Sequence, residues 1–322
     1  MDVNNVGRIG VLMGGPSSER EISLKSGKAV QEALRGVGIN VVGIDIKTDN
    51  VKENMRLIQY YGINCAFIAL HGKFGEDGTI QKILEDLEIP YTGSGVEASK
   101  LAMDKIASLR LFEEAGLAVP AYEILEKNSN WSFSGNIKFP LVVKPATHGS
   151  SIGLSIIDKN SALAEALNLA FSFDDRVIIQ EYIRGREMTV GILDGQALPV
   201  IEIVPKKRFF DYEAKYQSGM TEYIVPARLE DSIAKKIQES AINAHRLLGC
   251  SGCSRADIIL NELNIPFILE VNTIPGLTAT SLLPKAAKAV GIEFVQLCLK
   301  LIALAYEKNK SKPKLKTKRL IN

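Results

Sequence analysis

Strand-like and helix-like segments alternate through the N-terminal third of this 322-residue chain, and the alternation limits the folds it can adopt. An apolar run ending in glycine, RIGVLMGG, precedes an amphipathic segment, SEREISLKSGKAVQEALRGVG, and two more apolar runs follow, NVVGIDI and CAFIALHG. Apolar runs of this length are typical of buried strands, whereas the amphipathic segment has the 3.6-residue period of a helix. The pattern predicts βαβ units on a parallel sheet.

Polar residues follow the first and third of these predicted strands. Ligands of parallel α/β sheets bind beyond the carboxyl ends of the strands, which directs attention to Glu19 and His71. The alternative for His71 is that it simply caps a turn. We expect Ser17 or Ser18 to cap the amphipathic helix and Glu21 to complete a capping box, which leaves Glu19 free to face the cleft.

Residues 104–186 combine two helical patterns with short β-type runs, and a small-residue loop, PATHGSSIG, lies between two of the runs. One helix is expected over MDKIASLRLFEEAGL. A loop of this kind between antiparallel strands can fold its backbone N–H groups over phosphates, although plain hairpin turns share its composition. Lys144 lies in the apolar run directly before the loop, where an ammonium needs an anionic partner. Together the two features favour a phosphate site.

Two apolar runs near the C-terminus, SRADIIL and FILEVNTIPG, carry the oxygen donors Asp257, Glu270 and Asn272. Residues two apart share one face of a strand, so Glu270 and Asn272 point the same way. Carboxylate and amide oxygens suit Mg²⁺, which completes its shell with water and phosphate. The alternative is a set of polar strand residues at a solvent boundary. A lone acid within the run PFILEV would be costly, which favours the metal site and, with it, a nucleotide.

A polar connection rich in aromatic and charged residues, RFFDYEAKYQSGMTEYIVP, precedes these strands. Because structureless connections of this length are uncommon inside a compact domain, it predicts a functional lid.

Composition excludes several other classes of protein. The net charge is +2 and falls further without the lysine-rich C-terminal segment, so the folded part lacks the excess of positive charge typical of nucleic-acid-binding proteins. No apolar run is long enough to span a membrane. Four scattered cysteines do not form a disulfide framework, and the single C-x-x-C, Cys250 to Cys253, lacks a second pair or a suitably spaced histidine. We expect a cytoplasmic protein with a disordered basic tail at 308–322.

Seven segments in sequence resemble the motifs of the D-alanine–D-alanine ligases, a family with the ATP-grasp fold. They are GGPSSEREISLKSG, LHGKFGEDGTIQ, PYTGSGVEASKLAMDK, VVKPATHGSSIG, FDYEAKYQSG, RADIIL and LEVNTIPGLTATSL. The resemblance covers residues 7–306. It implies an α/β fold, α+β in its ATP-grasp part, with an N-terminal parallel-sheet domain (1–103), a central ATP-binding domain (104–186) and a C-terminal ATP-grasp domain (187–307). The nucleotide would bind between the last two.

The resemblance also implies an activity: ATP-dependent joining of two D-alanines through an acyl phosphate, for peptidoglycan synthesis. By the same resemblance, the catalytic residues are Glu19, Ser150, Tyr216, Arg255 and Gly276, and the substrate is further bound by His71, Ser281 and Leu282. ATP would contact Lys105, Lys144, Ser151, Gln180, Glu181, Ile183, Glu187 and Lys215. Two Mg²⁺ or Mn²⁺ ions would be held by Asp257, Glu270 and Asn272. The family is usually homodimeric.

Some alternatives stay open at this point. Gln180 stands where the family commonly has an acid; its amide oxygen can still accept from adenine, but purine selectivity could be looser. Lys105 could be a solvated surface charge, and Tyr216 a residue that only packs the lid. Family members that use D-lactate tend to differ at the position of Tyr216, which favours an amine as second substrate. The rival functions are a D-alanine–D-lactate or other carboxylate–amine ligase, and a nucleotide-binding regulator without catalysis.

Overall fold

A parallel sheet forms the N-terminal part of the computed structural model, which describes residues 6–129, 133–205 and 221–311. The strands lie in the order β2-β1-β3, and Tyr91 extends the sheet through a parallel bridge to Ala66. The predicted βαβ arrangement is confirmed. Its elements are β1 (Ile9–Gly14), α1 (Arg20–Gly36), β2 (Val41–Ile46), α2 (Val51–Tyr61), β3 (Cys65–Ile68), α3 (Thr79–Asp86) and α4 (Val96–Met103).

The start of α1 differs from the prediction. The residue that precedes the helix is Glu19, and its side chain makes no capping hydrogen bond, so the expected capping box with Glu21 is wrong. The Ser17 hydroxyl accepts the Glu19 N–H at 3.2 Å and donates to the His71 carbonyl at 2.7 Å. Ser17 therefore ties the start of α1 to the segment after β3, and it leaves the Glu19 carboxylate facing a cavity.

An antiparallel sheet of four strands, in the order β4-β7-β5-β6, forms the central part. The helix predicted from Met103 is interrupted at Asp104, whose extended backbone separates α4 from α5 and whose side chain caps α5. The loop of small residues does connect two antiparallel strands, β5 and β6. The elements are α5 (Lys105–Glu114), β4 (Tyr122–Glu126), β5 (Leu141–Pro145), β6 (Ser155–Ile157), a 3₁₀ turn η2 (Asn160–Ala162), α6 (Leu163–Phe171) and β7 (Arg176–Glu181).

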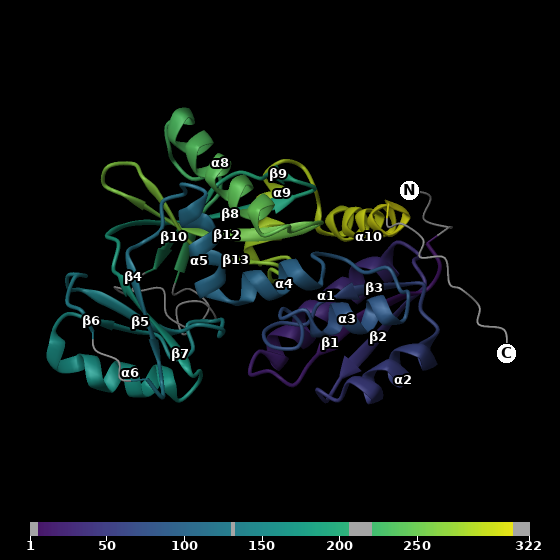
Figure 1. Ribbon diagram of the computed structural model, residues 1–322. Coiled ribbons are helices and arrows are strands. Elements are labelled where there is room, and N and C mark those ends of the chain that lie inside the picture. The colour runs from purple at the N-terminus through teal and green to yellow at the C-terminus, as the bar shows by residue number, and fades with distance from the viewer. Residues whose placement is uncertain (1–5, 130–132, 206–220, 312–322) are drawn as a thin grey trace.

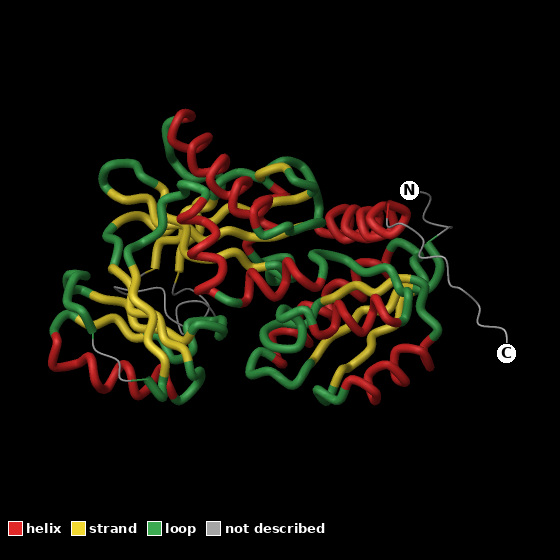
Figure 2. The backbone as a smooth tube through the Cα atoms, viewed as in Figure 1, coloured by secondary structure: helices red, strands yellow, loops and turns green. Residues whose placement is uncertain are grey.

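A third, larger sheet follows, in the order β11-β10-β8-β12-β13, with β9 beside β8. Figure 2 shows the three sheets as separate groups of strands. Part of the predicted lid is a strand, because Thr221–Ile224 pairs with β10; residues 206–220 lie outside the described residues. The elements are β8 (Gly185–Leu193), β9 (Gln196–Ala197), β10 (Ile201–Pro205), β11 (Thr221–Ile224), α8 (Asp231–Leu247), β12 (Cys253–Asn261), β13 (Pro266–Asn272), α9 (Leu282–Lys288) and α10 (Phe294–Ser311).

Helix α10 returns from the third sheet to the first and packs against α1 and β3 (Figure 1). Its buried residues Leu297, Leu301 and Ile302 share one apolar core with strand β1. The disordered tail predicted from 308 begins too early, because α10 is helical to Ser311 and Lys308 contacts the Gly93 carbonyl and the Tyr91 ring. Within the described ranges no helix is long and apolar enough to cross a membrane.

Each of the three sheets corresponds approximately to one of the predicted domains, 1–103, 104–186 and 187–307. The boundaries between these domains stay a prediction. Helix α5 belongs to two cores at once: Ile106 and Leu109 pack against the central sheet, whereas Phe112 lies in the core beneath the C-terminal sheet. This helix therefore holds the two sheets side by side.

Candidate active site

One face of the C-terminal sheet carries the predicted metal ligands. Asp257 on β12 lies directly between Thr189 on β8 and Glu270 on β13, and Arg255 pairs with Asn272 one step along the same face. The opposite face is apolar and packs into the core beneath α8; it presents Met188, Val190, Ala256, Ile258 and Val271. Strict alternation along β8 and β12 thus separates a polar face from a core face.

A β-bulge in β13 interrupts the alternation of side chains between Ile268 and Glu270. Asp257 opposes Glu270 but Ile258 opposes Ile268, so Leu269 is an extra residue in β13. Leu269 and Glu270 consequently both line a cavity, although they are adjacent in sequence. In a regular strand Ile268 and Glu270 would share one face, whereas the bulge lets Ile268 face the core while Glu270 faces the cavity. Bulges beside active sites commonly redirect a side chain in this way.

Cations of the protein pair with both carboxylates. The Arg255 guanidinium spans Asp257, from Nε to Oδ1 at 2.9 Å and from Nη2 to Oδ2 at 2.8 Å. The Thr189 hydroxyl donates to Asp257 Oδ1 at 2.7 Å. The Lys105 ammonium lies 3.1 Å from Glu270 Oε2.

The donor set fits a divalent cation that shares its shell with a ligand. Two carboxylates and an amide oxygen are hard donors of the kind Mg²⁺ takes, and they lie on neighbouring strands. No group of three or more His, Cys, Asp or Glu side chains suited to a metal occurs in the part of the chain that the structure describes. Mg²⁺ in proteins usually keeps waters beside one or two carboxylates and takes its remaining ligands from substrate phosphates.

A cavity of about 210 Å³ lies between the central and C-terminal sheets. Seven of the eight residues predicted to bind ATP line it; the eighth, Lys215, lies outside the described residues. The seven are Lys105, Lys144, Ser151, Gln180, Glu181, Ile183 and Glu187. The structure thus brings together side chains that span 83 positions of sequence, from 105 to 187.

Gln180 is 2% exposed, and its Nε2 makes no hydrogen bond to any residue that the structure describes. An amide buried beside a cavity without a partner is costly unless a ligand supplies one.

The loop between β5 and β6 extends from the 210 Å³ cavity to Glu19 in the N-terminal part of the chain. Ser150 and Ser151 have positive φ angles, 54° and 58°, a conformation that non-glycine residues adopt rarely and mostly at functional sites. The Ser150 hydroxyl donates to the Glu19 carboxylate. The Lys105 ammonium donates to the His148 carbonyl at 2.9 Å. The loop is therefore held from both sides.

A second cavity, of about 600 Å³, lies between the N-terminal part and the C-terminal sheet. The residues predicted to act on the substrate meet at its wall, except Tyr216, which lies outside the described residues. They are Glu19, His71, Ser150, Arg255, Gly276, Ser281 and Leu282. Lys105, Arg255 and Glu270 line both cavities. The two cavities therefore share a wall that carries both positively and negatively charged side chains.

Two family models match most of this chain. Residues 47–94 and 111–303 match the models for the N-terminus and the C-terminus of D-ala D-ala ligase. The chain belongs to the D-alanine–D-alanine ligase family. A D-alanine–D-alanine ligase of Syntrophotalea carbinolica is 47% identical over 92% of this chain and 95% of its own length. One of Pelotomaculum thermopropionicum is 47% identical, over 93% and 97%.

Solved structures of the family have the same fold. The D-alanine–D-alanine ligase of Bacillus anthracis complexed with ATP matches with a TM-score of 0.84 and 34% identity, over 94% of this chain and 99% of that one. A D-Ala:D-Ser ligase from Enterococcus faecalis matches with a TM-score of 0.81 and 32% identity, over 93% and 99%. The predicted ATP-grasp fold is confirmed.

Several residues of the site were not predicted from the sequence. Ser26, Tyr223 and Thr278 line the larger cavity, and Thr189 binds Asp257 from the neighbouring strand on the same face of the sheet. Period-2 alternation along β8 could have indicated Thr189, because Glu187 on the same strand was already assigned to the pocket face. Ser26 carries no such signal, since a serine on the buried side of a helix has no distinctive pattern.

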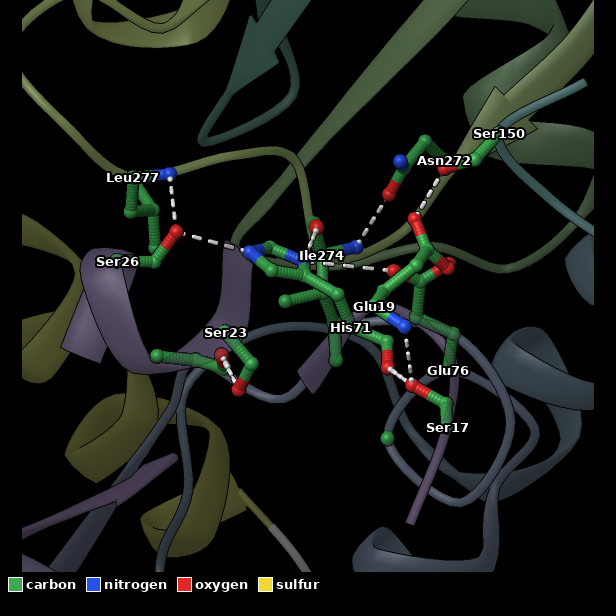
Figure 3. Close-up of polar contacts among 12 residues, drawn as sticks. Ser17, Glu19, Ser23, Ser26, His71, Glu76, Ser150, Asn272, Ile274 and Leu277 are labelled. Carbon is green, nitrogen blue, oxygen red and sulfur yellow. Dashed lines mark hydrogen bonds and ion pairs between the residues drawn. The ribbon is translucent and has the colours of Figure 1, made fainter. Parts of the chain in front are cut away.

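His71 occupies a buried position in the cavity wall, and both of its ring nitrogens bind protein atoms (Figure 3). Nδ1 lies 3.1 Å from the Ile274 carbonyl, and Nε2 lies 2.9 Å from the Ser26 hydroxyl. A carbonyl oxygen can only accept, so Nδ1 carries a proton, and in the neutral ring Nε2 then accepts from Ser26. The Glu76 carboxylate lies 3.6 Å from the same Nδ1. The predicted contact of His71 with substrate stays a prediction.

Proposed function

We propose that this protein joins two molecules of D-alanine at the expense of ATP, giving D-alanyl-D-alanine, ADP and phosphate for peptidoglycan synthesis. The observation that carries the proposal is the shared wall of the two cavities. Lys105, Arg255 and Glu270 border both spaces, so the end of a polyphosphate in one would meet a carboxylate in the other.

In the first step, a carboxylate oxygen of one D-alanine bonds to the γ-phosphorus as the bond to ADP breaks. The two reacting groups are both anionic, so nearby cations must offset their repulsion. Lys105 and Lys144, 8% and 7% exposed, supply fixed positive charge that water screens poorly. We assign Glu19, held by Ser150, to receive the ammonium of the same alanine.

In the second step, the amine of the other D-alanine, after losing a proton, attacks the acyl carbon, and phosphate leaves. Negative charge develops on the acyl oxygen, for which we assign Arg255 and the backbone N–H of Gly276 as donors. The Ser281 hydroxyl and the Leu282 N–H, with Arg255, would bind the carboxylate of this second alanine. Both residues lie at the start of α9, where N–H groups have no partner within the helix.

Asp257, Glu270 and Asn272 are the residues that would hold two Mg²⁺ or Mn²⁺ ions. Bound metal would neutralise the phosphate oxygens and orient the γ-phosphoryl group. Thr189 fixes one ligand oxygen, and the bulge at Leu269 aims another.

Because the reaction consumes ATP and all four cysteines are free thiols, we place the protein in the cytoplasm. Association into a homodimer stays a prediction, which the mass of the protein in solution would test.

The experiment is ADP release by the purified protein in the presence of ATP and Mg²⁺, with D-alanine, L-alanine, D-serine or D-lactate as acceptor. D-alanine alone should support turnover and yield the dipeptide. Faster turnover when D-serine or D-lactate is added would assign a different second substrate, as in the D-Ala:D-Ser ligase relative. Absence of any D-alanine-dependent ADP release would refute the proposal and favour a regulator that only binds nucleotide.

A further inference from the structure

Ser26 lies at the centre of a buried chain of hydrogen bonds that connects helix α1 to the turn after β13. The side chain is fully buried. Its hydroxyl donates to Nε2 of His71 at 2.9 Å, and its oxygen accepts the Leu277 N–H at 3.4 Å. His71 in turn donates from Nδ1 to the Ile274 carbonyl at 3.1 Å. Each donor in the chain has an acceptor (Figure 3).

The two backbone groups held by this chain bracket Gly276. The Ile274 carbonyl is two residues before it, and the Leu277 N–H is on the next residue. Gly276 is also closely packed, since a Cβ atom there would lie 3.0 Å from the Ser281 hydroxyl oxygen. The orientation of its peptide groups therefore depends on anchors supplied by the N-terminal part of the chain.

We propose that Ser26 and His71 are positioning residues that fix the Gly276 N–H for the oxyanion of the acyl-transfer step. The inference rests on the proposed ligase function. An oxyanion donor stabilises the transition state only when it already points at the developing charge. With both nitrogens engaged by Ser26 and Ile274, the His71 ring acts through the turn and not by donating to substrate.

Ser23 offers a matched control one turn earlier on α1. It is fully buried like Ser26, and its hydroxyl donates to the Ala69 carbonyl at 2.7 Å, away from the turn. Ser23→Ala and Ser26→Ala each remove one buried hydroxyl from the same helix; the first takes a partner from the Ala69 carbonyl, the second from Nε2 of His71 and from the Leu277 N–H. Both should lower the melting temperature, Ser26→Ala more, whereas only Ser26→Ala should alter the turn.

The test is steady-state kinetics of D-alanine ligation by the full-length protein, with nucleotide binding measured separately. Ser26→Ala should lower kcat by on the order of tenfold or more while the KM and Kd for ATP change by less than about twofold, because mispositioned groups cost transition-state stabilisation. Ser23→Ala should keep kcat within about twofold of the wild type. Equal kcat values for the two variants, or a loss confined to the KM for ATP, would overturn the inference.

Two further variants keep the inference testable if Ser26→Ala folds poorly. Ser26→Cys keeps nearly the same shape with a weaker donor and acceptor, so its kcat should fall between wild type and the alanine variant. Combining Ser26→Ala with His71→Leu should cost less than the sum of the two single losses, since the two residues hold the same turn and bind each other. Additive losses would contradict this. A wild-type protein without D-alanine turnover would refute the proposed function as well. If the wild type is active and the two serine-to-alanine variants have equal kcat values, only the positioning role is refuted.

Discussion

Asp104 lies at the joint between α4 and α5, and its replacement by alanine should destabilise the protein through two separate losses. Its Oδ1 accepts the N–H groups of Ile106 and Ala107 at 3.0 and 3.1 Å. Loss of such a cap costs about 1 kcal/mol. Its Oδ2 binds Arg176 Nη2 at 2.9 Å, and because the two side chains are 27% and 39% exposed, water screens this pair. The pair contributes about 0.5 kcal/mol.

The expected loss for Asp104→Ala is therefore about 1.5 kcal/mol, or about 2 °C in melting temperature for a protein of this size. Asp104→Asn keeps the capping oxygen and loses the charge, so it should cost about 0.5 kcal/mol. Comparing the melting temperatures of these two variants with that of Arg176→Met separates the contribution of the helix cap from that of the ion pair. Because α5 begins with Lys105, the alanine variant should also raise the KM for ATP. Equal melting temperatures for the alanine and asparagine variants would refute the capping argument.

Three further predictions concern single side chains. Thr189→Val removes the hydroxyl that holds Asp257, and should weaken Mg²⁺-dependent ATP binding by about tenfold in calorimetric titrations, while Thr189→Ser should restore it. Glu270→Gln should abolish turnover and keep part of the ATP affinity; an unaffected rate would exclude a metal role. Burial lowers the pKa of His245 from 6.5 to about 4, so the unfolded chain binds a proton that the folded protein rejects, and stability should fall as pH drops from about 6.5 to 4. The loss is up to about 3 kcal/mol, and His245→Gln should remove this slope in melting temperature against pH.

Patterns with a fixed period could be predicted from the sequence, and they place much of the site. Alternation along the last two strands of the C-terminal sheet puts Asp257 and Asn272 on a polar face, and the structure has them there. The same alternation holds between Glu270 and Asn272 but breaks between Ile268 and Glu270, where Leu269 is an extra residue. Nothing in the run PFILEV marks a bulge, because its position is set by pairing with β12 and not by the strand's own residues.

Interactions between distant segments could not be predicted, and they account for the errors at element ends. The serines before α1 suggested a capping box, but Ser17 binds the carbonyl of His71, 54 positions away. The basic residues from 308 suggested disorder, but Lys308 contacts Tyr91 and Gly93 of the N-terminal part and α10 continues through it. Local composition carries no information about such partners.

The central claim is that one carboxylate is phosphorylated at the shared wall of the two cavities and then transferred to an amine. Its most direct test is oxygen transfer with D-alanine labelled with ¹⁸O in the carboxylate, in the presence of ATP and Mg²⁺. The account predicts one labelled oxygen in each phosphate released, together with one dipeptide, because the carboxylate oxygen that attacked phosphorus leaves with it. Unlabelled phosphate accompanying dipeptide formation would contradict the account.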